Sequence, residues 1–297
     1  MEYAKLPLDF TSIIAMLKNR GLIIQNESAA IEYLKVIGYF RLENYLHSME
    51  LDKVAHTYKP NSNFNNAISL YNFDRDLRTL LFPATQAFEI ALRTKLSHYA
   101  SIRHGAFWFS INNLFQDKII FDNCLSRLHK EVERSREDFI TAHFDKYSSP
   151  DFPPSWKTFE ITSFGTISKM LCNFNDNSIK KKIAREFNLP QHIVLENWVK
   201  CAVIMRNYIA HHSRIWNRSF PIIPQTHPLL KGKWINNDIS KSSKLYPHIC
   251  CLKYIYDLAQ PDNKLKLDLQ QLFLSYTNID IRAMGFPKDW QDEPLWH

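Results

Sequence analysis

The sequence predicts an all-α protein. Of its 297 residues 45% are hydrophobic, so the chain can bury a substantial core. Only 6 residues are glycine, which leaves few positions for tight hairpin turns. Apolar residues recur at helical spacing along most of the chain, and no segment shows a confident strand pattern. We therefore expect a fold built from helices.

The first sixty residues read as short helices. One covers residues 9–22, with Asp9 or Thr11 as a candidate N-cap and Gly21 as a stop signal. The same apolar pattern continues through residues 26–49. A polar loop at residues 56–66 ends this part of the chain.

A long helical block follows at residues 67–101, with a kink expected at Pro83. Residues 117–147 form another amphipathic helix, with its charged residues on the solvent side. The next segments are a loop with three prolines at 148–156 and shorter helices at 159–174 and 177–189.

Pro190 opens a helix predicted over residues 190–216, because proline is well tolerated in the first helical turn. A wheel at roughly 100° per residue places five apolar side chains in one sector, the expected buried seam. These are Trp198, Ala202, Met205, Ile209 and Trp216. A poorly patterned basic stretch reaches to about residue 247, and two closing helices follow at 246–259 and 263–279.

The charge balance points to a polyanionic partner. The net charge is +7 and the pI is about 9.0, for which nucleic acid is the commonest explanation. The five cysteines have no metal-ligand spacing and fit reduced thiols in a cytosol. Neither a signal peptide nor a run of membrane-spanning length is present, so we expect a cytoplasmic protein that does not enter membranes.

The segment "RNYIAHHSRIWNR", residues 206–218, concentrates cationic and titratable side chains after the apolar run "VKCAVIM". On the wheel Asn207, His211 and Arg214 share a polar face, and Arg206 lies at its border. His212 falls near the apolar margin, where a histidine is more often packed and hydrogen-bonded than reactive. The alternative for His211 is an ordinary solvent-exposed histidine.

Arg206 and His211 are the residue types needed to cut RNA. RNA supplies its own nucleophile, the 2′-hydroxyl, and an imidazole can take or give the proton near neutral pH. A guanidinium offers forked donors to phosphate oxygens and stabilises the additional negative charge of the transition state. This chemistry requires no metal or other cofactor. We also find no His/Asp/Glu cluster with metal-ligand spacing, so neither is expected.

The spacing alone is weak support, because other arginines precede a histidine at a similar distance: Arg41/His47, Arg93/His98 and Arg136/His143. The pair formed by Arg206 and His211 differs in three respects. An asparagine follows the arginine, an apolar helix precedes it, and further basic residues come after it.

Three segments together resemble a known group of proteins. "MRNYIAHHSRIWNR" resembles the Arg-Asn-x-x-x-His signature of the HEPN superfamily. The stretches at residues 17–45 and 71–101 are similar to the Abi-like branch of phage abortive-infection proteins, the AbiD/AbiF type. The resemblance covers roughly residues 10 to 220 and leaves the C-terminal part uncovered.

The resemblance implies a HEPN-type helical bundle with an N-terminal helical extension and C-terminal helices. We divide the chain into an N-terminal helical region (1–60), a HEPN-like domain (61–220) and a C-terminal basic loop with closing helices (221–297). The implied activity is metal-independent endoribonuclease action as a toxin of bacterial anti-phage defence, leaving a 2′,3′-cyclic phosphate.

The resemblance also implies roles for individual residues. Arg206 would bind and stabilise the scissile phosphate, His211 would transfer the proton, and Asn207 would orient the pair. Arg206 and His211 lie about 140° apart on one helix, so a second copy in a homodimer would complete the site. Four residues are supporting candidates: His212, Arg214, Glu89 and Arg93. Glu89 and Arg93 could instead form a structural pair on the helix surface.

Further basic residues are candidates for contacts with RNA phosphates: Lys180, Lys181, Lys182 and Arg218. A solvated basic face is the alternative interpretation. RNA is the expected partner, as substrate and as a candidate bound small RNA. Two other functions stay open: a non-catalytic RNA-binding or regulatory HEPN protein, and a helical scaffold that senses a phage protein.

Overall fold

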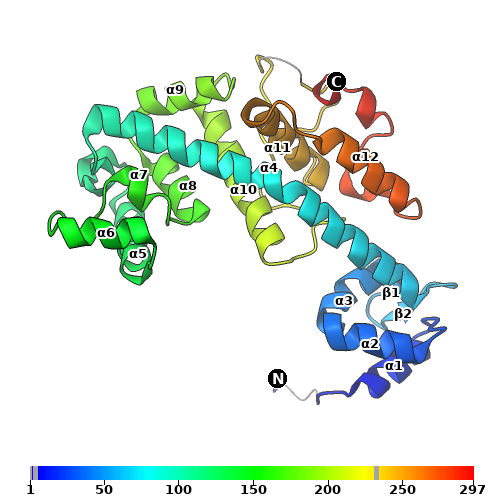
Figure 1. Cartoon of the computed structure of the whole chain (residues 1–297). Coiled ribbons are helices and arrows are strands. Elements are labelled where there is room, and N and C mark those ends of the chain that lie inside the picture. Colours follow the sequence, from blue (N-terminus) through cyan, green and yellow to red (C-terminus); the bar gives the residue numbers. More distant parts are fainter. Residues whose placement is uncertain (1, 3–5, 231–233) are drawn as a thin grey trace. The chain divides into compact units, whose positions relative to one another are not determined.

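The structure, a computed structural model, describes residue 2, residues 6–230 and residues 234–297. In this described part it contains twelve α-helices and one small two-stranded sheet (Figure 1), which confirms the all-α prediction. None of the described helices is both long enough and apolar enough to cross a membrane.

The chain forms two compact units. The first, unit 1, combines the chain up to Arg78 with Leu269–Asp280, and the second, unit 2, contains Thr79–Asp268 and Ile281–His297. This division differs from the three consecutive regions expected from the sequence. The difference arises because a segment near the C-terminus belongs with the N-terminal helices.

Unit 1 begins with short helices, as expected. They are α1 (Phe10–Asn19), α2 (Glu27–Ile37) and α3 (Tyr39–Leu46), followed by the 3-10 turn η1 (His47–Met49). Asp9 is the N-cap of α1, since its Oδ1 accepts a hydrogen bond from the Ser12 amide at 2.7 Å. The pattern over residues 26–49 divides at Gly38, whose φ of +82° ends α2.

The hairpin after η1 was not anticipated. Strands β1 (Glu50–Asp52) and β2 (Thr57–Tyr58) pair antiparallel, with Glu50 opposite Tyr58. Strands of three and two residues are too short to show the alternating pattern by which a strand is identified in a sequence.

Unit 1 also contains the first part of α4 (Phe64–His104) and residues 269–280. We call residues 269–280 the return segment, because the chain comes back to unit 1 there. Phe73 packs against Phe273 and Tyr276, with ring centroids 6.2 and 5.5 Å apart. The Tyr276 hydroxyl donates to Asp76 Oδ2 at 2.7 Å. Most of this segment belongs to α12 (Leu265–Ser275). The return segment is therefore part of the core of unit 1.

Helix α4 is 41 residues long and runs through Pro83 without interruption. The following helices of unit 2 are α5 (Lys118–Arg134), α6 (Asp138–Lys146), α7 (Ser155–Thr158), α8 (Phe164–Asn173), α9 (Asn177–Glu186), α10 (His192–Ala210) and α11 (Leu245–Ala259). The single helix predicted over 117–147 is wrong, because the chain is extended at Ser135 and the Ser135 Oγ accepts from the Glu137 amide at 3.3 Å.

Helix α10 lies at the centre of unit 2. It packs against α8, α9 and α11, and the predicted seam of Trp198, Ala202, Met205, Ile209 and Trp216 is buried. The buried seam fixes the rotation of α10 and therefore which of its polar side chains face outward.

Candidate active site

Helix α10 ends at Ala210, six residues before the predicted boundary. The amide of Ser213 donates to the Tyr208 carbonyl at 2.8 Å, and that of His212 donates to the Ile209 carbonyl at 3.1 Å. These two bonds form a Schellman motif, with His212 in the left-handed conformation at φ +55°. The predicted common helical face of Asn207, His211 and Arg214 is therefore wrong, because the chain turns between His211 and Arg214.

Arg206, on the last turn of α10, is held by a carboxylate of α4. Its Nε lies 3.3 Å from Glu89 Oε2, and its side chain is 34% exposed. The other oxygen of Glu89 accepts from Arg93 Nη2 at 2.7 Å. No further partner of the Arg206 guanidinium lies in the described part of the chain. Its terminal Nη groups are therefore able to donate to an incoming anion.

The predicted Glu89–Arg93 pair is present, but it is not a surface pair. The two side chains are 12% and 13% exposed. Arg93 also donates to the carbonyls of Glu160, at 3.4 Å, and Thr162, at 3.0 Å. Arg93 thus anchors Glu89 and the chain before α8, and Glu89 in turn orients Arg206.

His211 and Asn207 are tied through the backbone. His211 is the C-cap residue of α10, and its amide donates to the Asn207 carbonyl at 2.9 Å. The His211 side chain is exposed, whereas that of Asn207 is half-buried. Within residues 6–230 and 234–297, neither the imidazole of His211 nor the amide of Asn207 has a side-chain hydrogen bond. Both groups are available to a ligand.

The supporting candidates beyond the helix end lie in different surroundings. His212 is exposed, which corrects the expectation that it packs against the core, because the positive φ turns it away from the apolar seam. Arg214 Nη1 donates to the Trp216 carbonyl at 3.0 Å. Arg218 stacks 4.1 Å above the Tyr208 ring and donates to the Arg214 carbonyl at 2.9 Å. Both arginines therefore stabilise the turn after α10.

The three lysines predicted to contact RNA are not equivalent. Lys180 is buried, and its Nζ lies 2.9 Å from Glu196 Oε1. This corrects the expectation that it faces RNA, because it faces α10 from the buried side of α9. Lys181 and Lys182 are exposed, and the Lys182 ammonium lies 4.1 Å from the Tyr99 ring centroid.

In each of the other arginine–histidine spacings, one group is buried or already held by a partner. Arg93 is enclosed by the partners described above, and His143 is buried. His47 lies 2.9 Å from a carboxylate oxygen of Glu50. Arg206 and His211 combine a positioned guanidinium with an accessible imidazole.

A basic cleft with a volume of about 1040 Å³ opens between α5, α8 and α10. Its cationic residues are Arg127, Lys169 and Lys200, all exposed and without an ion-pair partner in the described chain. Asn207 also lines this basic cleft. The three cations were missed in the sequence because they are far apart along the chain and no local motif joins them.

Cys172 also lines the basic cleft. Burial raises the pKa of its thiol to about 11, so the sulfur is protonated at neutral pH. The cleft therefore offers cations and amides to a ligand, but no thiolate nucleophile.

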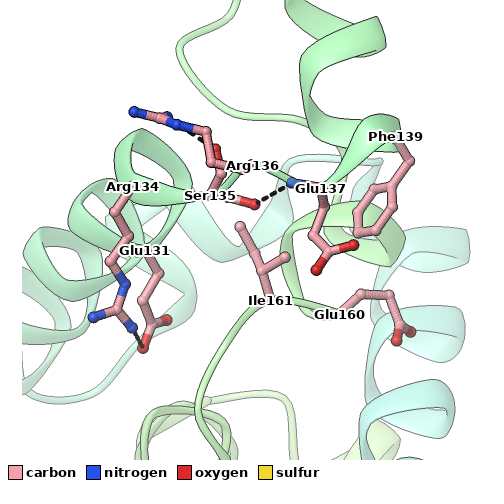
Figure 2. A pocket seen from close by; sticks show the side chains of 8 residues that line it. All are labelled: Glu131, Arg134, Ser135, Arg136, Glu137, Phe139, Glu160 and Ile161. Carbon is pink, nitrogen blue, oxygen red and sulfur yellow. Dashed lines mark hydrogen bonds and ion pairs between the residues drawn. The ribbon is translucent and has the colours of Figure 1, made fainter.

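A second cavity, of about 600 Å³, lies where α5 ends and α6 begins (Figure 2). Its charged residues are Glu131, Glu137, Glu160, Arg134 and Arg136. Glu131 and Arg134 lie 4.0 Å apart. Carboxylates outnumber guanidinium groups here, so this cavity is unfavourable for a phosphate chain.

Potential metal ligands do cluster in unit 1, contrary to the sequence expectation. Oxygen or nitrogen atoms of His47, Glu50 and His56 lie within 4.8 Å of one another. The cluster was missed because the unanticipated hairpin brings His56 next to Glu50.

Comparison with known proteins identifies the family. A model of the Abi-like protein family matches residues 32–217. The match covers more than half of the chain and includes Glu89 together with Arg206, Asn207 and His211. Searches of curated proteins and of solved structures gave no significant match. The chain belongs to the Abi-like protein family.

Proposed function

We propose that this Abi-like protein is a metal-independent endoribonuclease of the HEPN type, in its AbiD/AbiF branch, that acts as a toxin in anti-phage abortive infection inside bacteria. The proposal rests on the way in which the Arg206 guanidinium is held. Glu89 holds its Nε at 3.3 Å, while the terminal Nη groups have no partner in the described chain. An exposed histidine follows five residues later.

The chemistry assigned to these groups is transfer of a phosphodiester within RNA. His211 removes the proton of the 2′-hydroxyl, whose oxygen attacks the adjacent phosphorus. The bond from phosphorus to the 5′-oxygen breaks, and that oxygen leaves with a proton from a second acid. The products are a 2′,3′-cyclic phosphate and a free 5′-hydroxyl. Arg206 stabilises the negative charge that develops on the phosphate oxygens.

The basic cleft suits the rest of an RNA strand. Arg127, Lys169 and Lys200 can neutralise successive phosphates. Asn207 connects this cleft to the reactive residues, because its side chain lines the cleft and its carbonyl accepts from the His211 amide. Asn207 is thus placed to orient the strand relative to His211.

We further propose that the protein acts as a homodimer. Arg206 is directed toward α4, whereas His211 caps the end of α10. A second copy related by a two-fold axis would bring an arginine of one chain toward a histidine of the other and would supply the second acid.

The test is cleavage of cellular RNA by the purified full-length chain in EDTA. His211→Ala is expected to reduce the rate by about 10²–10⁴-fold, because it removes the proton acceptor. Arg206→Ala is expected to cost about 10²–10³-fold. The matched control is His98→Ala, which removes another exposed histidine that follows an arginine by five residues. Equal rates for His211→Ala and the wild type would refute the proposal.

A non-catalytic RNA-binding function is the second candidate, and the basic cleft is the observation that favours it. In that case RNA would bind in a salt-sensitive manner without being cut. Arg206→Ala would weaken this binding and His211→Ala would leave it unchanged. Separate measurements of binding and cleavage on the same variants distinguish the two functions.

A further inference from the structure

Two histidines and a glutamate, His47, Glu50 and His56, form a cluster of potential metal ligands in unit 1. His47 begins η1, Glu50 begins β1, and His56 lies in the turn between the strands. His47 Nδ1 lies 2.9 Å from Glu50 Oε2, and His56 Nδ1 lies 3.2 Å from Glu50 Oε1. Two imidazoles therefore approach opposite oxygens of one carboxylate.

The carboxylate at the centre is buried without a permanent cation. The Glu50 side chain is 3% exposed. Among the described residues its ion-pair partners are His47 and His56 alone, and no lysine or arginine lies within 4.0 Å. Burial of a carboxylate with neither a lysine nor an arginine beside it is costly, and a bound metal cation would offset this cost.

We propose that His47, Glu50 and His56 form a Zn²⁺ site in unit 1. Two imidazole nitrogens and one carboxylate oxygen are a ligand set that Zn²⁺ commonly binds. Ligand atoms around tetrahedral zinc are about 3.3 Å apart for bonds of about 2.0–2.1 Å. The observed distances of 2.9 and 3.2 Å, each to a different oxygen of Glu50, are within a few tenths of an ångström of this value. All three candidate ligand atoms lie within 4.8 Å of one another, so side-chain rotation could bring them around one ion.

Access and rigidity also suit an ion. The His47 and His56 side chains are 44% and 40% exposed, so an ion can enter and a water can fill the fourth position. The hairpin is held by its own hydrogen bonds, since Asp52 Oδ1 accepts from the Val54 amide at 2.7 Å and the Ala55 amide at 3.1 Å. His56 itself has a φ of +54°, and its ring lies beside the Glu50 carboxylate.

The ion would serve as a structural clamp. It would join the end of α3, through η1, to the start of β1 and to the residue before β2, in a region whose sheet has only two short strands. Such small elements gain stability from a metal cross-link. The proposed ribonuclease residues all lie in unit 2, so this inference is independent of the proposed function.

The experiment is titration of the full-length, tag-free chain with Zn²⁺ by calorimetry after dialysis against a chelator, and with Co²⁺ by visible absorption. The wild type is expected to bind one equivalent of Zn²⁺ and to give the intense absorption bands of tetrahedral Co²⁺. The double substitution His47→Ala with His56→Ala should lose both signals. Glu50→Gln, which keeps the shape of the side chain, should also lose them.

Two controls make the result decisive. His98→Ala removes a histidine outside the cluster and should bind like the wild type. Circular dichroism of each variant verifies that it is folded, and Glu50→Gln tests the site without leaving a buried carboxylate unpaired. Absence of stoichiometric binding by the wild type, or unchanged binding by the folded histidine variant, would overturn the proposal. RNA cleavage by the same variant is expected to persist.

Discussion

At the scale of single residues, His212 adopts a backbone conformation that favours glycine. It sits at φ +55° directly after the cap of α10, at the position where helices most often carry glycine. The histidine therefore introduces backbone strain beside the proposed catalytic residue.

Replacing His212 with glycine is expected to stabilise the protein by about 1 kcal/mol, because glycine has no Cβ to clash in this conformation. The thermal unfolding midpoint should rise by about 2–4 °C in a chain of this size. The matched substitution, His211→Gly, should lower the midpoint, since His211 has a φ of −90°. An unchanged or lower midpoint for His212→Gly would contradict the strain assigned here.

Individual residues also show what the sequence could and could not reveal about the candidate site. Arg206, Asn207 and His211 are detectable because they are close together in one motif. The contact between Glu89 and Arg206 arises only when α4 packs against α10. The two residues are more than one hundred positions apart in the sequence, so no local motif predicts this contact. The i, i+4 spacing predicted the Glu89–Arg93 pair, but not its burial.

At the scale of elements, the sequence predicted which helices are present better than where each helix begins and ends. The apolar seam of α10 was identified from its period, because burial imposes that period on the sequence. Its end was misplaced, because the left-handed residue at the stop is a histidine and carries no glycine signal. The division between α5 and α6 was missed for the same reason, since no glycine or proline marks Ser135.

Helix α11 is tied to the irregular segment after α10 by His248. This residue is buried, with Nδ1 3.1 Å from the Lys244 carbonyl and Nε2 3.0 Å from the Ile222 carbonyl. Burial lowers the pKa of His248 to about 4, although both carbonyls favour the protonated form. The folded protein therefore holds a neutral imidazole at neutral pH.

We expect this histidine to make stability depend on pH. As the pH falls below about 6.5, the unfolded chain takes up a proton that the folded protein accepts only near pH 4. The contribution of His248 is complete above pH 6.5 and is lost as the pH falls toward 4. The free energy of unfolding should decrease by about 3 kcal/mol over this interval.

The measurement is urea denaturation at a series of pH values, for the wild type and for His248→Gln. The variant lacks the titrating group, so its decline between pH 6.5 and 4 should be smaller. Burial also lowers the pKa of His143 and of His192, so some decline will persist. Identical pH dependence in both proteins would refute the role assigned to His248.

At the scale of the whole molecule, unit 1 is discontinuous in sequence. Phe73, which is fully buried, packs against Phe273 and Tyr276 from the return segment. The sequence predicted the closing helix at residues 263–279, but the pairing of this helix with α4 depends on contacts across about two hundred residues. The spacing of apolar residues within one segment does not reveal contacts between segments so far apart in the sequence.

Phe273→Ala is expected to destabilise unit 1 by about 2 kcal/mol, because it removes aromatic surface from Phe73. Limited proteolysis should then cut residues 6–78 faster while residues 79–268 stay protected. The neighbouring substitution Leu274→Ala is the control, since Leu274 is largely exposed. Equal protection of residues 6–78 in the two variants would show that the return segment does not stabilise unit 1.

The discontinuity has a consequence for biosynthesis. The ribosome makes helices α1 to α3 and the hairpin well before residues 269–280, which complete their core. Domains generally fold as units during translation. Helices α1 to α3 and the hairpin must therefore wait until about two hundred further residues have been synthesised, and a chain that stops before residue 269 would carry them with an unfinished core.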